Sequence, residues 1–212
     1  MEQLQEWFKY LMDSKEIIQT GGLIAITLIV FIENGVIVGF FLPGDYLLFL
    51  SGVFCGTKLL DVPIVLLMFC VFSAAVFGSL LGYFTGRFFG DSIQEKKESL
   101  FFKKKYLENT QKYFEKYGSQ TLVIARFLPV IRTFAPILAG IVKMNFYKFM
   151  IFNVLGGLIW TFVLVGGGFY FGEKFPWIVD YVQYIIFFFL GITTFTVIRG
   201  YINARKELSE ME

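Results

Sequence analysis

Four charged residues lie within strongly apolar stretches of the sequence. Arg126 and Arg132 belong to the segment ARFLPVIRTFAPILAG at residues 125–140, and Glu33 and Asp45 belong to a second apolar stretch far upstream. An arginine guanidinium can hold phosphate oxygens through two parallel hydrogen bonds. Glu33 and Asp45 can neutralise both arginines when no anion is bound, and protonation of an acid would release an arginine. A site formed by Glu33, Asp45, Arg126 and Arg132 would therefore suit a phosphate-bearing ligand and a carrier-type mechanism.

The arginine-containing segment is a poor candidate for a plain lipid-facing helix. Each arginine at the centre of a membrane helix costs roughly 2.5–3.5 kcal/mol on insertion scales, and a proline inside a helix costs about 3 kcal/mol. Broken backbone at membrane depth is tolerated where it is buried in protein or lines a water-filled cavity. We therefore expect residues 121–142 to form a re-entrant hairpin, with its arginines turned inward and its bend near Pro129 to Pro136.

The upstream stretch has the same unusual composition. We expect a first re-entrant hairpin at about residues 23–55, broken at Pro43 and Gly44. A charged, proline-broken apolar segment in each half of a chain is the pattern expected of a transporter with internal repeats and a site at the midplane. Residues 23–41 also contain enough apolar side chains for a full crossing, so that alternative stays open.

The composition is that of an integral membrane protein with a single domain. The chain has 212 residues, of which 56% are hydrophobic and 20% aromatic, and its mean hydropathy is +0.65. Histidine is absent, which excludes Ser-His, Cys-His and histidine-metal chemistry. The two cysteines, Cys55 and Cys70, are expected to be buried free thiols. We therefore predict neither a cofactor nor a metal site.

The remaining segments predict an all-α protein with one membrane domain at residues 21–206. Long apolar runs predict transmembrane helices, and polar runs with helical periodicity predict helices at the membrane interface. In chain order we expect an amphipathic interfacial helix at 1–20, a transmembrane helix at 62–86, an amphipathic region at 87–120, transmembrane helices at 146–172 and 178–198, and a polar tail at 207–212.

Four glycines recur every four residues in and just beyond the predicted transmembrane helix at 62–86. They are Gly78, Gly82, Gly86 and Gly90. Residues at this spacing share one helix face, and small residues on that face let another backbone approach closely. We expect the face to pack against a hairpin, with another subunit of an oligomer as the alternative.

Basic residues orient the predicted topology. Thirteen lysines and arginines fall on one side of the membrane, eight of them in 87–116, whereas the loops on the other side contain only Lys58 and Lys174. The positive-inside rule makes residues 87–120 and the C-terminus cytoplasmic. The second hairpin then enters from the cytoplasm and the first from the opposite face. Acidic residues are interspersed within the basic region, which argues against nucleic-acid binding and favours contact with anionic lipid headgroups.

Several motifs resemble those of one membrane protein family. They are Glu33 followed by FLPGD at 41–45, GYFTGRFFG at 82–90, and ARFLP at 125–129 followed by Arg132-Thr133 and Ala139-Gly140. Together they resemble the DedA family, also called the SNARE-associated or VTT-domain proteins, over about residues 22–205.

The resemblance implies a bacterial inner-membrane protein with two facing re-entrant hairpins. Members are implicated in moving lipids between leaflets: polyprenyl phosphate carriers in some, phosphatidylethanolamine in others, and scrambling in eukaryotic relatives. Their dependence on proton motive force is associated with acidic and arginine residues, which correspond here to Glu33, Asp45, Arg126 and Arg132.

The residues and the resemblance together predict a membrane lipid translocase and not an enzyme. Its expected substrate is a phosphate-bearing lipid such as undecaprenyl phosphate or a glycerophospholipid, with protons as a coupling ion. An ion or proton antiporter or channel is the main alternative, with the acids as the ion path; paired arginines argue against a cation pore. A lipid-phosphate hydrolase, a non-transporting scaffold and a static ion-pair network joining the hairpins are the others.

Overall fold

The computed structural model describes residues 14–36, 39, 44–95, 120–175, 177, 184 and 191. Several predicted features lie outside the described residues: the interfacial helix up to residue 13, Pro43, the basic region from 96 to 119, most of the helix at 178–198, and the C-terminal tail. Within the described residues the regular structure is helical, which confirms the all-α prediction for this part of the chain.

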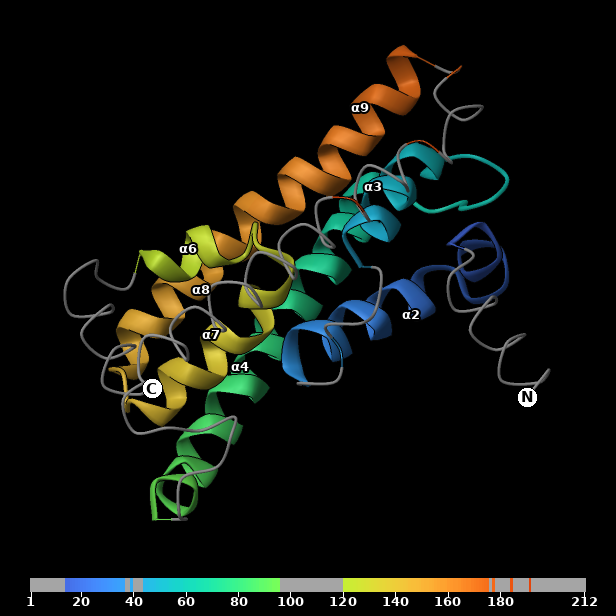
Figure 1. The fold of residues 1–212 in the computed structure, drawn as a ribbon. Helices are drawn as coiled ribbons and strands as arrows, with labels where there is room; N and C mark the ends of the chain where they lie inside the picture. The colour runs from blue at the N-terminus through green and yellow to red at the C-terminus, as the bar shows by residue number, and fades with distance from the viewer. Residues whose placement is uncertain are drawn as a thin grey trace, which may run out of the picture.

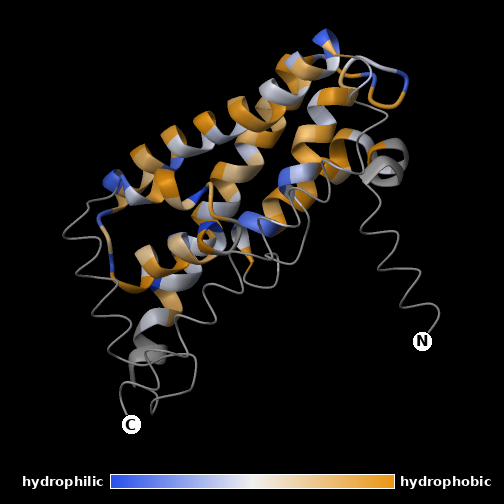
Figure 2. Cartoon of the chain, turned by 45° about the horizontal axis from the view of Figure 1, so that its top comes forward, coloured by the Kyte–Doolittle hydropathy of each residue, from blue (hydrophilic) through white to orange (hydrophobic). Residues whose placement is uncertain are grey.

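Two long apolar helical stretches run through the molecule. One is α4 (Ile64–Glu95); the other is the continuous run of α8 (Phe146–Thr161), the π-helix η2 (Phe162–Gly166) and α9 (Gly167–Lys174). The parts Ile64–Gly90 and Phe146–Lys174, of 27 and 29 residues, are long and apolar enough to cross a membrane. Figure 2 shows hydrophobic residues predominating along the helices.

α4 extends beyond the transmembrane helix predicted at 62–86. It continues to Glu95, into the segment predicted to be a separate cytoplasmic amphipathic region. The extension has a packing reason, because the backbone at Gly86 and Gly90 still contacts Ile137 and Ile141 of a neighbouring helix. These tertiary contacts support the helix as far as Gly90, four residues beyond the predicted end at 86.

The charged stretches form shorter helices. The upstream stretch forms α2 (Ser14–Gly35) and α3 (Gly44–Phe54); the downstream stretch forms α6 (Thr121–Ala125) and α7 (Pro129–Ile141). α2 is kinked at Gly22, where φ is 52° and ψ is −142°. This backbone region favours glycine, and the kink lies close to the predicted boundary between interfacial helix and membrane domain.

The break in the downstream stretch lies earlier than the sequence predicts. The chain turns at residues 126–128, and Pro129 is the first residue of α7, where its missing N–H and fixed φ are favourable. The prediction of a bend extending to Pro136 is wrong, since Pro136 lies inside α7. Close packing of α7 on α4 holds the helix together there, because a Cβ on Gly140 would stand 2.1 Å from the carbonyl oxygen of Tyr83.

The glycine face of α4 contacts both charged stretches. A Cβ on Gly78 would stand 2.6 Å from the carbonyl oxygen of Phe31 in α2, and a Cβ on Gly86 would stand 2.0 Å from that of Ile137 in α7. Gly82 and Gly90 also face α7, where a Cβ would stand 3.3 Å from Ile137 Cγ1 and 3.1 Å from Ile141 Cα, both tight contacts. A real Cβ does not fit at the distances found for Gly78 and Gly86, so these two glycines are what permits α4 to lie against α2 and α7.

α3 packs against the second long helix in the same manner. A Cβ on Gly52 of α3 would stand 2.2 Å from the carbonyl oxygen of Val165 in η2, and one on Gly168 of α9 would stand 2.1 Å from that of Phe49. Figure 1 shows α3 beside α9, with α2 and α7 meeting next to α4. This arrangement brings the N-terminal end of α3, the C-terminal end of α2 and the first turn of α7 to one place.

Candidate functional site

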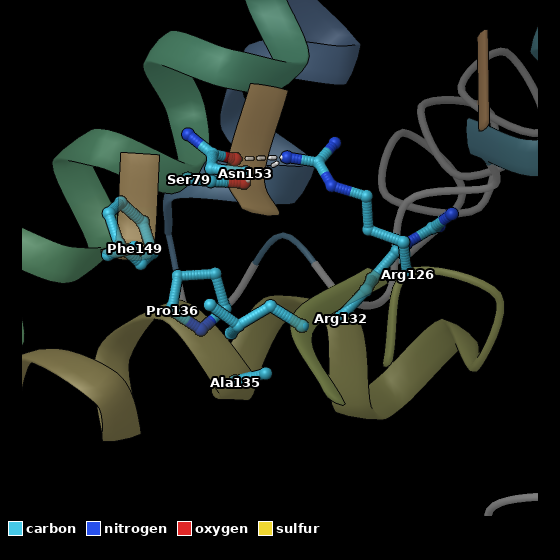
Figure 3. A pocket seen from close by; sticks show the side chains of 8 residues that line it. Ser79, Arg126, Arg132, Ala135, Pro136, Phe149 and Asn153 are labelled. Carbon is cyan, nitrogen blue, oxygen red and sulfur yellow. Dashed lines mark hydrogen bonds between the residues drawn. The ribbon is translucent and has the colours of Figure 1, made fainter. Parts of the chain in front are cut away.

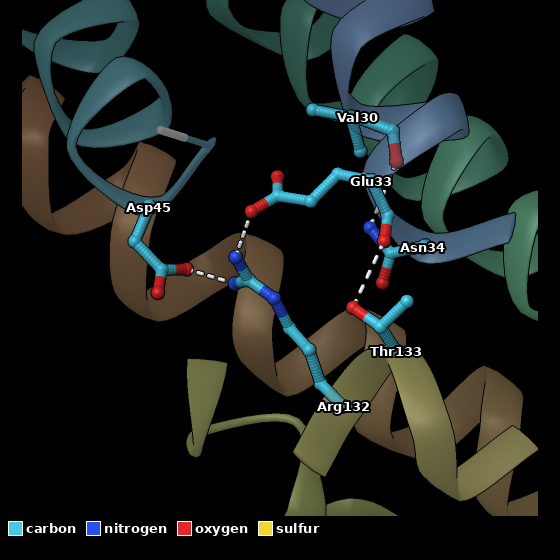
Figure 4. Close-up of polar contacts among 6 residues, drawn as sticks. All are labelled: Val30, Glu33, Asn34, Asp45, Arg132 and Thr133. Atoms are coloured by element: carbon cyan, nitrogen blue, oxygen red, sulfur yellow. Dashed lines mark hydrogen bonds and ion pairs between the residues drawn. The ribbon is translucent and has the colours of Figure 1, made fainter. Parts of the chain in front are cut away.

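Arg132 is the centre of a buried ion-pair cluster. Its Nη2 donates to Oε1 of Glu33 at the end of α2, and its Nη1 donates to Oδ1 of Asp45 in the first turn of α3. Figure 4 shows the guanidinium lying between the two carboxylates. Glu33 is 0% and Arg132 4% exposed. One cation therefore joins three helices, and with all groups ionised the cluster carries one negative charge in excess.

Neighbouring groups fix this cluster in place. Thr133 Oγ1 donates to the backbone oxygen of Glu33 over 3.1 Å, which ties α7 to α2 beside the ion pairs. The Trp160 ring of α8 lies under the guanidinium of Arg132, with 5.2 Å between Cζ and the ring centroid. A cation over an indole face is attracted by the ring quadrupole. The arginine is therefore held by charge on one side and by an aromatic face on the other.

Gly44 provides the space that the Glu33 carboxylate occupies. A Cβ at this first residue of α3 would stand 1.5 Å from Glu33 Oε2. The carboxylate thus lies against the N-terminal end of an 11-residue helix, where the backbone dipoles favour negative charge. Gly44 was predicted as a backbone break; in the structure it is also the residue whose missing side chain admits the acid.

Arg126 is not part of the ion-pair cluster. It is 4% exposed, and its Nη2 donates to Asn153 Oδ1 of α8 and to Ser79 Oγ of α4, at 3.0 Å for the serine. The Ala75 carbonyl oxygen is a third, longer contact at 3.5 Å. The expectation that the acids neutralise both arginines is therefore corrected: within the described residues, Arg126 has neutral oxygen partners and no carboxylate.

The two arginines border one small cavity. Its lining comes from α4, α6, α7 and α8: Ser79, Leu122, Arg126, Arg132, Ala135, Pro136, Phe149 and Asn153. The free space is about 10 Å³, room for about one water molecule. Figure 3 shows the guanidinium of Arg126 directed toward Ser79 and Asn153. In this conformation the cavity has no room for a ligand larger than water.

Three buried polar atoms of the site have no hydrogen-bond partner among the described residues. They are Glu33 Oε2, Arg126 Nη1 and Arg132 Nε. A buried donor or acceptor without a partner costs free energy, so atoms of this kind require a functional or structural reason. The site therefore has spare donors on both arginines, which is what binding an anion requires.

The structure places Glu33, Asp45 and Arg132 in one group and Arg126 in another, and both arginines border the same cavity. It also shows partners of these residues that sequence reasoning missed. The missed residues are Ser79, Asn153 and Trp160. A signal for Asn153 was present, since it is an amide inside the predicted span at 146–172, followed one turn later by Gly156-Gly157. Ser79 lies next to Gly78 of the glycine face, and nothing in the sequence marks it or Trp160 as a partner of an arginine.

Comparison with known proteins identifies relatives over most of the chain. Residues 42–170 match the VTT domain, a range that includes Asp45 and both arginines and begins after Glu33. Protein DedA of Escherichia coli (strain K12) is 35% identical over 176 residues, 83% of this chain and 78% of the relative. Uncharacterized membrane protein Rv0364 of Mycobacterium tuberculosis (strain ATCC 25618 / H37Rv) is 39% identical over 148 residues, 70% of this chain and 65% of the relative.

Inner membrane protein YqjA of Escherichia coli (strain K12) is 33% identical over 145 residues, 68% of this chain and 65% of the relative. No solved structure matches the chain. The VTT-domain match spans α3, α4, α6, α7 and α8, which carry Asp45, Arg132 and the Arg126 contacts, and it leaves out α2 with Glu33.

Proposed function

The chain belongs to the VTT-domain (DedA) family of membrane proteins, and from that premise we propose that it moves a phosphate-bearing lipid between the leaflets of the inner membrane. The observation that carries the proposal is the burial of two arginines, with spare guanidinium donors, among helices of which two are long and apolar enough to cross a membrane. Undecaprenyl phosphate or a glycerophospholipid has the headgroup that such donors recognise.

Helix length supports a re-entrant arrangement of the two charged stretches. At 1.5 Å per residue, α3 extends about 16 Å, α7 about 20 Å, and the apolar part of α2, Gly21–Gly35, about 22 Å. All three fall short of the roughly 30 Å of hydrocarbon in a bilayer. We interpret α2–α3 and α6–α7 as two re-entrant hairpins whose tips face each other where Arg132 meets Glu33 and Asp45, with residues 87–120 and the C-terminus on the cytoplasmic side.

The free-energy cost of the cluster argues for transport over a static role. Buried ion pairs are often no more stabilising than well-packed apolar side chains of similar volume, and charge at membrane depth is costly. Rigid attachment of the hairpins would need only leucine and phenylalanine. A cluster that opens has a use for these charges: separation of α7 from α2 and α3 frees Arg132 and enlarges the cavity that it shares with Arg126.

The same geometry supports a proposal of proton coupling. Protonation of Glu33 or Asp45 weakens its ion pair with Arg132, so a proton and a lipid phosphate compete for one guanidinium. One charge crossing 100 mV is worth about 2.3 kcal/mol, enough to maintain a roughly 40-fold lipid gradient. Alternating protonation would therefore drive net lipid movement.

The test is lipid translocation in proteoliposomes. Fluorescent phosphatidylglycerol, fluorescent phosphatidylethanolamine and a polyprenyl phosphate would each be supplied, with and without an imposed pH step. We expect the protein to translocate at least one of these lipids. We expect the Arg132→Ala variant to match empty vesicles, and Lys148→Ala, which removes an exposed cation on α8, to match the unaltered protein. An active Arg132→Ala variant would contradict the proposed role of this residue.

The acids are tested in the same vesicles. The Glu33→Gln, Asp45→Asn double variant should lose pH-driven accumulation and keep part of the passive exchange, because Arg132 no longer has an acid that must be protonated. Accumulation that survives in the double variant would exclude these acids as the coupling site. Absence of translocation of every phosphate lipid by the unaltered protein would overturn the proposed function.

A further inference from the structure

The two buried arginines differ in the charge of their partners. Arg132 contacts two carboxylates, whereas the partners of Arg126 among the described residues are the amide oxygen of Asn153, the hydroxyl of Ser79 and the carbonyl of Ala75. All three oxygens are uncharged. The Arg126 side is therefore a fixed positive charge, while the Arg132 side carries the excess negative charge. The difference suggests separate roles for two residues of the same type.

Asn153 is held so that its oxygen faces Arg126. Its Nδ2 donates to the backbone oxygen of Val76 over 3.1 Å, and the side chain is 2% exposed. An asparagine whose amide nitrogen is engaged in this way must direct its oxygen to the other side, which is where the guanidinium lies. The Val76 contact thus sets the orientation of the amide, and the amide sets the position of the guanidinium.

α8 also provides the room that the long arginine side chain needs. A Cβ on Gly156 would stand 3.2 Å from Cδ of Arg126, and one on Gly157 would stand 3.4 Å from its Nη1. The three residues Asn153, Gly156 and Gly157 share one face of α8 by their spacing. This face is shaped to receive Arg126, and it leaves Nη1 without a hydrogen-bond partner among the described residues.

We propose that Asn153 and Ser79 are positioning residues that hold Arg126 without neutralising it, and that Arg126 is thereby the permanent binding point for a phosphate monoester or diester. The proposal rests on the proposed function for the identity of the substrate. Arg132, in contrast, is the arginine that the acids engage and release. An aspartate at position 153 would fit the same space and would convert the neutral contact into an ion pair.

The experiment compares three variants by the thermal stability of the detergent-solubilised full-length protein. The probes are dioctanoyl phosphatidic acid, inorganic phosphate, and dioctanoyl glycerol, which lacks phosphate. A ligand that binds only the folded protein raises the unfolding temperature by an amount that grows with the logarithm of its concentration relative to Kd, so a titration reports the affinity. We expect phosphatidic acid to stabilise the unaltered protein, and dioctanoyl glycerol to leave its stability unchanged. If inorganic phosphate stabilises the protein as much as phosphatidic acid does, the site binds the free anion; if inorganic phosphate has no effect, the site binds the phosphate as part of a lipid.

The variants separate positioning from a purely structural role. Asn153→Asp should weaken phosphatidic acid binding about tenfold or more, since the new carboxylate neutralises Arg126. Asn153→Ala should keep measurable binding of phosphatidic acid, because Arg126 keeps its positive charge. This holds even if the unliganded Asn153→Ala variant is less stable than the unliganded Asn153→Asp variant. Asn145→Asp adds the same charge at the exposed N-cap of the same helix and should bind as the unaltered protein does.

Two results would overturn the proposal: binding by Asn153→Asp equal to that of the unaltered protein, or no stabilisation of the unaltered protein by either phosphate probe. A purely structural Asn153 predicts the first of these, because the ion pair would preserve the packing. The measurement does not require translocation. Binding that depends on Asn153 in a protein that moves no lipid would refute the proposed function alone.

Discussion

Replacing Arg132 by methionine should destabilise the protein strongly, and adding Glu33→Gln should offset part of the loss. Arg132 and Glu33 are 4% and 0% exposed. Removing one partner of a buried ion pair costs about 3–5 kcal/mol, because the remaining charge stays buried without its counter-charge. Glu33→Gln alone leaves Arg132 paired with Asp45 and loses one charged hydrogen bond, about 1.5–3 kcal/mol.

Independent effects would sum to about 4.5–8 kcal/mol in the double variant. We expect the double variant to lose no more than Arg132→Met alone, since glutamine leaves no unpaired charge at position 33. The expected coupling free energy is therefore at least about 1.5–3 kcal/mol. Unfolding by sodium dodecyl sulfate in mixed micelles, followed by tryptophan fluorescence, measures all four corners of this cycle.

Lys148→Met is the matched control, because it removes an exposed cation and should change the free energy of unfolding by less than about 0.5 kcal/mol. An additive double variant, or an Arg132→Met variant within about 1 kcal/mol of the unaltered protein, would refute the reasoning. Either result would mean that the two side chains do not share one buried environment.

Three glycine substitutions, one of them a control, test the packing that holds the site. Gly86→Ala places a Cβ 2.0 Å from the carbonyl oxygen of Ile137, so an overpacking cost of about 1–3 kcal/mol should outweigh the gain of about 0.5–1 kcal/mol that alanine brings to a helix. Gly167→Ala is the control: no atom lies within 4 Å of its added Cβ, so this substitution should stabilise the protein. The same unfolding assay checks both, and equal effects would contradict the close contact. Gly44→Ala should displace the Glu33 carboxylate from Arg132 and reduce lipid translocation to near background, and full activity of this variant would show that Gly44 does not make room for the acid.

The sequence by itself determined the class of protein and singled out the four charged residues that the structure places in or beside the ion-pair cluster. Charges and prolines within long apolar runs are costly in a bilayer, so Glu33, Asp45, Arg126 and Arg132 stand out before any contact is known. The four-residue spacing of the glycines on α4 likewise indicates a close helix contact, since it follows from helix geometry alone. The all-α fold and the family followed from the same local information.

Other features are decided by distances between segments that are far apart in the chain. The sequence predicts that acids neutralise both arginines, but Arg132 engages both acids and Arg126 is held by Asn153 and Ser79. These partners are 27 to 99 residues apart, and no local pattern reports such a pairing.

Backbone propensity also gives way to tertiary contact at Pro136. Proline is a strong helix breaker as a local signal, and the sequence predicts a bend that reaches this residue. Packing of α7 on the glycine face of α4 keeps the helix continuous through it. The sequence thus determined which residues raise the free energy of a membrane segment, because that free-energy cost depends on the residue type and on the apolar residues around it. Only the tertiary structure decided how the free-energy cost of each buried charge and of the proline is offset, because the offset depends on which distant groups pack against that residue or come within hydrogen-bonding distance of it.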